Sequence, residues 1–144
     1  MSDRLQKLYH PIIRQHNAAP INFEKREGRE VVTANNSICG DKFEFFVSCD
    51  KERLGTISFY GIGCAVSKAS SSILVKLLEG KSLKEAIGIC ENFINYLEEK
   101  DKAVSAISED FEAFSAIWEF PQRFDCAALP WQEIRTFLRV VEAR

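Results

Sequence analysis

The hydrophobic pattern changes its period once, at the glycine-containing segment 61–63, and this change limits the folds that the chain can adopt. Before this segment, every second residue from Phe43 to Cys49 is apolar, a period of two that predicts a strand with one buried face. After it, apolar residues recur every three or four positions, as on an amphipathic helix. Strands followed by helices predict an α+β fold.

The strand region predicts a small antiparallel sheet of about three strands. Residues 21–34 alternate weakly and contain Glu27-Gly28, which predicts a hairpin turn. The charged residues 50–53 predict a second turn, and 56–60 are expected to form the returning strand. The sheet is therefore expected to be a meander.

Four to six helices are expected to pack against this sheet. Gly80 has the position of a helix C-cap, and Ser82 with Glu85 forms a capping box. The expected helices, in chain order, are one that begins or bends at Pro11, one from Gly63 to Gly80, one after Ser82, a short one over 108–118 and one over 131–141.

Length and composition point to one globular domain over residues 1–144. The chain is 46% hydrophobic and has a formal net charge of −2, so it lacks the positive charge of nucleic-acid-binding proteins. No apolar run approaches the roughly 20 residues that span a bilayer, and the N-terminus lacks the apolar stretch of a signal peptide. We expect no nucleic acid and no membrane partner, and a cytoplasmic location.

The five cysteines are expected to be free thiols, because an odd number in a reducing compartment argues against a disulfide framework. Cys49 is in phase with the inward face of its strand, and Cys90 lies on the apolar stripe of its helix. Both are therefore interpreted as small core residues.

The other three cysteines stand beside residues that expose them or tune their charge. Cys39 lies in a polar loop, while Cys64 and Cys126 stand at expected helix starts, where the helix dipole favours a thiolate. Asp41 follows Cys39 with only Gly40 between them, so both could reach one ion. The spacing matches no short zinc-finger pattern, and Asp41 could instead form an Asx-turn or a helix cap.

Three motifs together resemble the IscU/NifU-like family of iron–sulfur cluster assembly scaffolds, and within it the SufU branch. They are Cys39-Gly40-Asp41 after paired asparagines, the Gly61–Ser72 segment with its cysteine and serines, and Arg123–Trp131 around the third cysteine. The resemblance runs from about residue 4 to residue 137. It implies the IscU/SufU-like fold.

Two departures favour the SufU branch. IscU-type chains place a histidine directly before the third cysteine, but Asp125 stands there, and His10 and His16 are far upstream. SufU-like chains also carry an insertion between the second and third cysteines, for which Lys81–Gln122 leaves room, including a short helix near 111–118. A basic residue is commoner in the family at the position of Asp125.

The resemblance implies a Zn²⁺ site built from Cys39, Asp41, Cys64 and Cys126. It implies a sulfurtransferase that takes persulfide sulfur from a cysteine desulfurase onto Cys39. Four anionic ligands around one dication leave a charge of about −2. Arg123, placed with Cys39 as a catalytic residue, is expected to offset part of it, or else to form a surface ion pair.

Two other functions use the same residues. The chain could be a scaffold that binds a transient [2Fe–2S] or [4Fe–4S] cluster and passes it to downstream assembly proteins. It could also be a zinc-stabilised binding module without activity. A nucleotide-binding interpretation of Gly61-Ile62-Gly63 is disfavoured, because the rest of a phosphate-loop pattern is missing.

Overall fold

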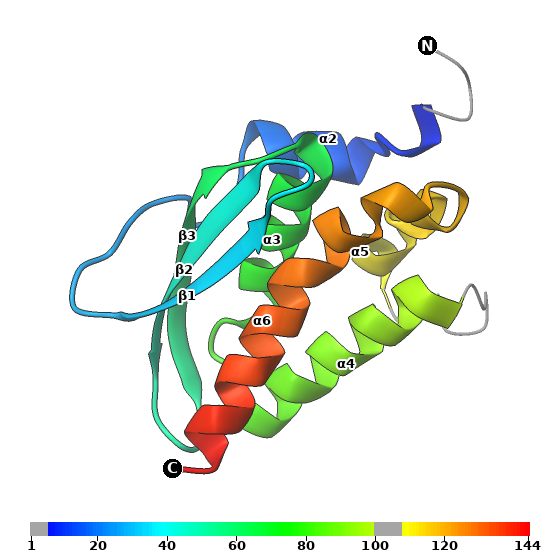
Figure 1. The fold of residues 1–144 in the computed structure, drawn as a ribbon. Helices are drawn as coiled ribbons and strands as arrows, with labels where there is room; N and C mark the ends of the chain where they lie inside the picture. Colours follow the sequence, from blue (N-terminus) through cyan, green and yellow to red (C-terminus); the bar gives the residue numbers. More distant parts are fainter. Residues whose placement is uncertain (1–5, 100–107) are drawn as a thin grey trace.

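The computed structural model describes residues 6–99 and 108–144, with a sheet on one side and helices on the other (Figure 1). The strands are β1 (Glu30–Asn36), β2 (Asp41–Cys49) and β3 (Leu54–Ile62). The α-helices are α2 (Pro11–Ala18), α3 (Ala65–Leu78), α4 (Leu83–Glu99), α5 (Glu109–Glu112) and α6 (Phe124–Glu142), with 3₁₀ turns η2 (Ser115–Glu119) and η3 (Pro121–Arg123). The predicted α+β class is confirmed, with a three-stranded antiparallel sheet and five α-helices in the described residues.

The sheet is a meander in the order β1-β2-β3, and aromatic side chains dominate its inner face. The ring of Phe59 on β3 lies 5.7 Å from that of Phe43 and 5.8 Å from that of Phe45, both on β2. All three side chains are at most 1% exposed. Burial along β2 alternates as the period-two pattern predicted, except at Phe46, which is also buried.

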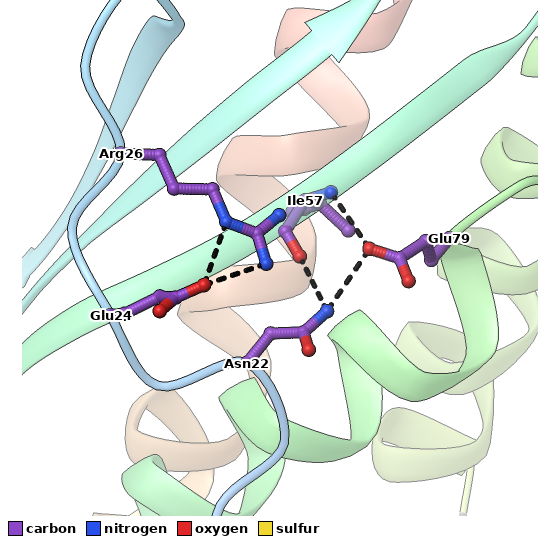
Figure 2. Close-up of polar contacts among 5 residues, drawn as sticks. All are labelled: Asn22, Glu24, Arg26, Ile57 and Glu79. Carbon is purple, nitrogen blue, oxygen red and sulfur yellow. Dashed lines mark hydrogen bonds and ion pairs between the residues drawn. The ribbon is translucent and has the colours of Figure 1, made fainter.

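A turn forms at Glu27-Gly28, as predicted, with Gly28 at a φ of 71°, but it does not join two paired strands and is therefore not the predicted hairpin. The segment before the turn is not a strand paired with β1. It contacts β3 instead, where Phe23 forms an isolated parallel bridge with Phe59. Asn22 has a φ of 50° and donates its side-chain N–H to the Ile57 carbonyl (3.1 Å) and to Oε2 of Glu79 (3.0 Å). Figure 2 shows this junction, which directs the segment alongside β3. The actual hairpin joins β1 to β2 through residues 37–40.

The predicted helix boundaries at capping residues are confirmed. Helix α2 begins at Pro11, and Ser82 Oγ accepts the Glu85 N–H (3.1 Å) at the start of α4. Gly80 has a φ of +79° just after α3, a conformation that glycine adopts without strain. Ser108 caps α5 by accepting the Asp110 N–H (3.0 Å). Segments 1–5 and 100–107, and the parts of the expected N-terminal helix and insertion that fall in them, lie outside the described residues.

The helices form two layers behind the sheet. Helix α3 packs against β3 and α6 against β1, while α4 lies on the far side of α6 (Figure 1). Trp131 of α6 is fully buried between these layers, 4.3 Å from the ring of Phe93 on α4. Cys90 is buried in the same core, as predicted, and Cys49 is half-buried at the end of β2. Of the two inner helices, α6 contains Cys126, and α3 begins directly after Cys64.

Candidate metal centre

Two of the candidate ligands come from the β1–β2 hairpin. Cys39 is exposed in the connecting loop, and Gly40 has a φ of +74°, which lets the chain turn sharply there. Asp41 opens β2 opposite Asn36 and is only 3% exposed. The hairpin thus presents the exposed thiol of Cys39 close to the buried carboxylate of Asp41.

Cys64 stands where β3 gives way to α3, and it caps that helix. Its Sγ accepts the Ser67 N–H (3.4 Å), and its own N–H donates to Oδ1 of Asp41 (2.9 Å). A β-carbon on the preceding Gly63 would lie 2.5 Å from Ser67 Oγ and 2.9 Å from the same Asp41 oxygen. Only glycine therefore lets the strand, the hairpin and the helix start meet here.

Cys126 completes the cluster from α6. Its thiol is buried, and its Sγ lies 3.4 Å from Sγ of Cys39. The donor atoms of Cys39, Asp41 and Cys126 all lie within 4.8 Å of one another. Cys64 adjoins this triplet through its backbone N–H, which donates to Oδ1 of Asp41 (2.9 Å). The structure therefore brings together all four residues proposed as ligands, with three in a tight group and Cys64 at its border.

The thiols of Cys64 and Cys126 shift each other's pKa in opposite directions. The neighbouring Cys126 thiol, helped by hydrogen bonds with Ser67, lowers the pKa of Cys64 to about 5 against the opposing effect of burial. The neighbouring Cys64 and burial raise the pKa of Cys126. These shifts favour the thiolate form at Cys64 and the thiol form at Cys126.

Arg123 lies at the entrance to α6, close to both inner cysteines. Burial lowers the pKa of its guanidinium, but the neighbouring Cys64 and Cys126 sulfurs outweigh this and raise it. This position supports the expectation that Arg123 offsets negative charge at the cluster. The salt bridges between described residues do not include Arg123.

A metal ion fits these residues. Oδ2 of Asp41 is buried and has no hydrogen-bond partner among the described residues. A buried carboxylate oxygen without a donor is costly unless a cation meets it. Three thiols and a carboxylate form a donor set suited to zinc or to an iron–sulfur cluster.

Sequence reasoning missed some contributions to this cluster. Asn36 donates its side-chain N–H to Cys126 Sγ (3.8 Å), and Ser67 contacts Cys64 through both its N–H and its hydroxyl group. Both residues lie within the quoted motifs, but only the folded chain shows which atoms they meet. Asp125 is exposed in the first turn of α6, where the helix dipole favours a carboxylate.

Comparisons with known proteins identify the family of the chain. The family model of the NifU-like N-terminal domain matches residues 8–134. The chain belongs to this family of iron–sulfur cluster assembly scaffolds. The resemblance found in the motifs is therefore confirmed at the level of the family.

Individual relatives carry two different functional names. The iron–sulfur cluster assembly scaffold protein IscU of Streptococcus pyogenes serotype M1 is 29% identical, over 94% of this chain and 86% of its own. The zinc-dependent sulfurtransferase SufU of Bacillus subtilis (strain 168) is 30% identical, over 90% and 88%. The crystal structure of FiSufU from Fervidobacterium islandicum AW-1 superposes with a TM-score of 0.80 at 25% identity, over 96% and 98%.

The described parts of the chain contain no helix with the length and apolar character that a bilayer crossing requires.

Proposed function

We propose that this chain is a zinc-dependent sulfurtransferase that accepts persulfide sulfur from a cysteine desulfurase onto Cys39. The supporting observation is the unequal exposure of the three thiols. Cys39 is exposed at a hairpin tip, Cys64 is half-buried at a helix start, and Cys126 is buried. An acceptor must reach the active site of another protein, and Cys39 has the position for this. The similarity to the Bacillus subtilis sulfurtransferase supports the same assignment.

Cys39, Asp41, Cys64 and Cys126 are the residues that would hold the metal. Bound zinc keeps its coordinating thiols deprotonated and shields them from oxidation. Asp41 supplies a hard oxygen, which is a weaker zinc partner than a fourth thiolate. This ligand set therefore favours a centre that releases a ligand more readily than a four-cysteine site.

The proposed transfer is a thiol–disulfide-type exchange at the outer sulfur of the donor persulfide. The Cys39 thiolate attacks that sulfur, and a sulfur–sulfur bond forms to Cys39 Sγ. The bond between the outer sulfur and the desulfurase cysteine breaks, and this cysteine leaves as a thiolate. The proton of the persulfide stays with the transferred sulfur, so the exchange needs no external oxidant or reductant.

Arg123 is proposed to act beside Cys39. Its guanidinium lies close enough to Cys64 and Cys126 for their sulfurs to raise its pKa. A fixed positive charge there stabilises the negative charge that remains on the cluster when Cys39 acts as a nucleophile. Arg123→Gln is expected to slow transfer while zinc stays bound.

The first experiment measures metal content and sulfur transfer in the same preparations. Protein purified without chelator is expected to contain about one zinc per chain, with no visible absorption bands. Persulfide formed on the chain after incubation with a cysteine desulfurase and cysteine is then located by mass spectrometry. Cys39→Ser should abolish it, whereas Cys49→Ser, at a half-buried cysteine outside the cluster, should not. Transfer that survives in Cys39→Ser would contradict the proposal.

The second candidate function is a scaffold for a transient iron–sulfur cluster. It is favoured by the name of the Streptococcus pyogenes relative and uses the same donor set. Iron with acid-labile sulfide and visible charge-transfer bands in the purified protein would place this function first. Cluster transfer to downstream iron–sulfur assembly proteins would then be the activity to assay.

The desulfurase is proposed to dock around the hairpin tip. Ile38, beside the acceptor Cys39, is 91% exposed, and Ile62, two residues before Cys64, is 74% exposed. Large apolar side chains at such exposure mark a contact surface when they flank a site. Ile62→Glu should weaken desulfurase binding in a pull-down or calorimetric titration, whereas Val140→Glu, 54% exposed on α6, should leave it unchanged. Equal effects of the two variants would exclude this surface.

A cytoplasmic location is proposed as well. The described residues contain only free cysteines, a state that a reducing compartment preserves.

A further inference from the structure

Ser70 connects the two inner helices at the level of the cluster. Its Oγ lies 2.6 Å from the carbonyl oxygen of Ala127, to which it donates, and accepts the Trp131 Nε1–H (2.9 Å). All three residues are fully buried. Ala127 directly follows Cys126 in α6, and Ser70 lies on the helix that Cys64 caps. One hydroxyl group thus links the backbone beside one candidate ligand to the helix that begins at another.

Ser70 and its neighbour Ser71 donate their hydroxyl hydrogens to different helices. Ser71 is equally buried but donates to the Ser67 carbonyl of its own helix (2.9 Å), the bond that a serine within a helix usually forms. Ser70 instead donates its only hydroxyl hydrogen to α6. Its hydrogen bonds therefore depend on the relative position of α3 and α6, whereas the hydrogen bond of Ser71 does not.

The first turn of α6 lacks part of its own support. Pro130 lies inside the helix and has no N–H to donate. In an α-helix that N–H would pair with the carbonyl four residues earlier, which belongs to Cys126. The turn that carries Cys126 therefore misses one backbone hydrogen bond. The bond from Ser70 to the next carbonyl, that of Ala127, does not fill the vacant place at Cys126, but it is an external contact that holds the same turn of α6 to α3.

We propose that Ser70 is a positioning residue of the metal centre. It sets the place of the Cys126 thiol relative to Cys64 and thereby the affinity and ligand geometry of the site. The inference rests on the metal-binding part of the proposed function and is independent of sulfur transfer. A purely structural role for Ser70 would instead change stability and leave the bound metal unaffected.

The test compares Ser70→Ala with Ser71→Ala in the full chain. Zinc affinity is measured by competition with a chromophoric chelator, and Co²⁺ is added as a spectroscopic probe of ligand geometry. Ser70→Ala should lower zinc affinity by about 10–100-fold, the usual effect of losing a group that orients a ligand, and alter the Co²⁺ ligand-field bands. Ser71→Ala should keep the affinity within about twofold, because only a local bond is lost.

If Ser70→Ala unfolds, as shown by loss of its helical circular dichroism signal, the comparison is repeated in a second background. In that background Pro130→Ala supplies an N–H for the Cys126 carbonyl, and Ser70→Ala and Ser71→Ala are each combined with it. The loss of zinc affinity caused by Ser70→Ala should be smaller there. Equal affinities and Co²⁺ spectra for Ser70→Ala and Ser71→Ala would overturn the proposal, as would loss of fold in both backgrounds. If the unsubstituted chain bound neither ion, the metal centre itself would be refuted instead.

Discussion

A β-carbon at position 63 would lie 2.6 Å from Cε2 of Phe43, in addition to its close approaches to Ser67 and Asp41. These atoms belong to β2 and α3, so the glycine is a contact point between elements rather than a flexible turn. Real β-carbons do not approach other atoms so closely, and something must move to admit one. At the scale of single residues, the geometry of the cluster therefore depends on Gly63 as much as on the four candidate ligands.

Gly63→Ala is expected to disrupt the metal centre more than the fold. The added methyl group must push Asp41 or Ser67 away from Cys64, and we expect zinc affinity to fall by about tenfold or more. Zinc content after dialysis and chelator competition would measure this. Gly88→Ala is the matched control, because nothing lies within 4 Å of its β-carbon in α4. It should retain zinc and stabilise the chain by about 0.5–1 kcal/mol.

Asp41→Asn should separate stability from metal binding. The substitution keeps an oxygen for the Cys64 N–H but removes the negative charge from the buried, unpartnered side of the carboxylate. The metal-free protein should then be at least as stable, because an uncompensated buried charge costs about 1–3 kcal/mol or more. Zinc affinity should fall. Urea denaturation with chelator and zinc competition measure the two effects, and a less stable metal-free variant would contradict the argument.

At the scale of elements, α2 is tied to α3 by a buried histidine. Nδ1 of His16 lies 2.7 Å from Oγ of Ser72, and the same Oγ accepts the Ile21 N–H (2.9 Å). Ser72 Oγ thus accepts the Ile21 N–H, and its own hydroxyl hydrogen can be donated to Nδ1 of a neutral His16. Asp110 and Lys76, which pair with each other at 2.9 Å, are the charged groups that act on the ring. The contact therefore suits an uncharged histidine.

The stability of the metal-free protein should fall as the pH drops below about 6.5, the ordinary pKa of histidine. Burial lowers the pKa of His16, with Asp110 opposing and Lys76 reinforcing the effect. The unfolded chain therefore binds the proton more readily than the folded one, and stability is lost on acidification until the pH passes below the folded pKa.

Urea midpoints of the metal-free protein at several pH values between about 5.5 and 7.5 would measure this dependence. His16→Gln cannot titrate, so it should show a shallower dependence on pH over the same range. The difference between the two curves isolates His16 from the cysteines and carboxylates, which both proteins share. Parallel curves would show that this histidine does not couple folding to pH.

At the scale of the whole molecule, the cluster joins three parts of the chain. The hairpin supplies Cys39 and Asp41, the start of α3 supplies Cys64, and α6 supplies Cys126. A metal bound by all of them must be released when any one of these parts unfolds. Binding and global stability should therefore be linked.

Removal of zinc should lower the melting temperature. Free zinc at about 100 times its dissociation constant adds about 2.7 kcal/mol, which for a domain of this size corresponds to about 5–10 °C. Differential scanning calorimetry with and without chelator would measure the shift. Asp41→Asn should shift less, and Cys49→Ser as much as the unsubstituted chain. A melting temperature that is indifferent to zinc would contradict the proposed centre.

Local patterns predicted most of the elements, although α6 begins at Phe124 and not at 131, and the helix expected over 108–118 is divided into α5 and the 3₁₀ turn η2. The alternation from Phe43 to Cys49 predicted β2, and the capping box at Ser82 and Glu85 predicted the start of α4. These patterns work because the side-chain direction repeats every two residues in a strand and about every 3.6 in a helix. The same periodicities assigned Cys90 to the core and left Cys39 in a loop.

Only the tertiary structure decided how distant segments meet. Asn22 donates hydrogen bonds to Ile57 and Glu79, and these bonds hold the segment beside β3, where the sequence had predicted a hairpin with a turn at residues 27–28. The same holds for the bond from Ser70 to Ala127, which spans 57 positions, and for the place of Cys64 at the border of the ligand triplet. A local pattern specifies which face of an element is buried, but the distance between two faces depends on the packing of every side chain between them.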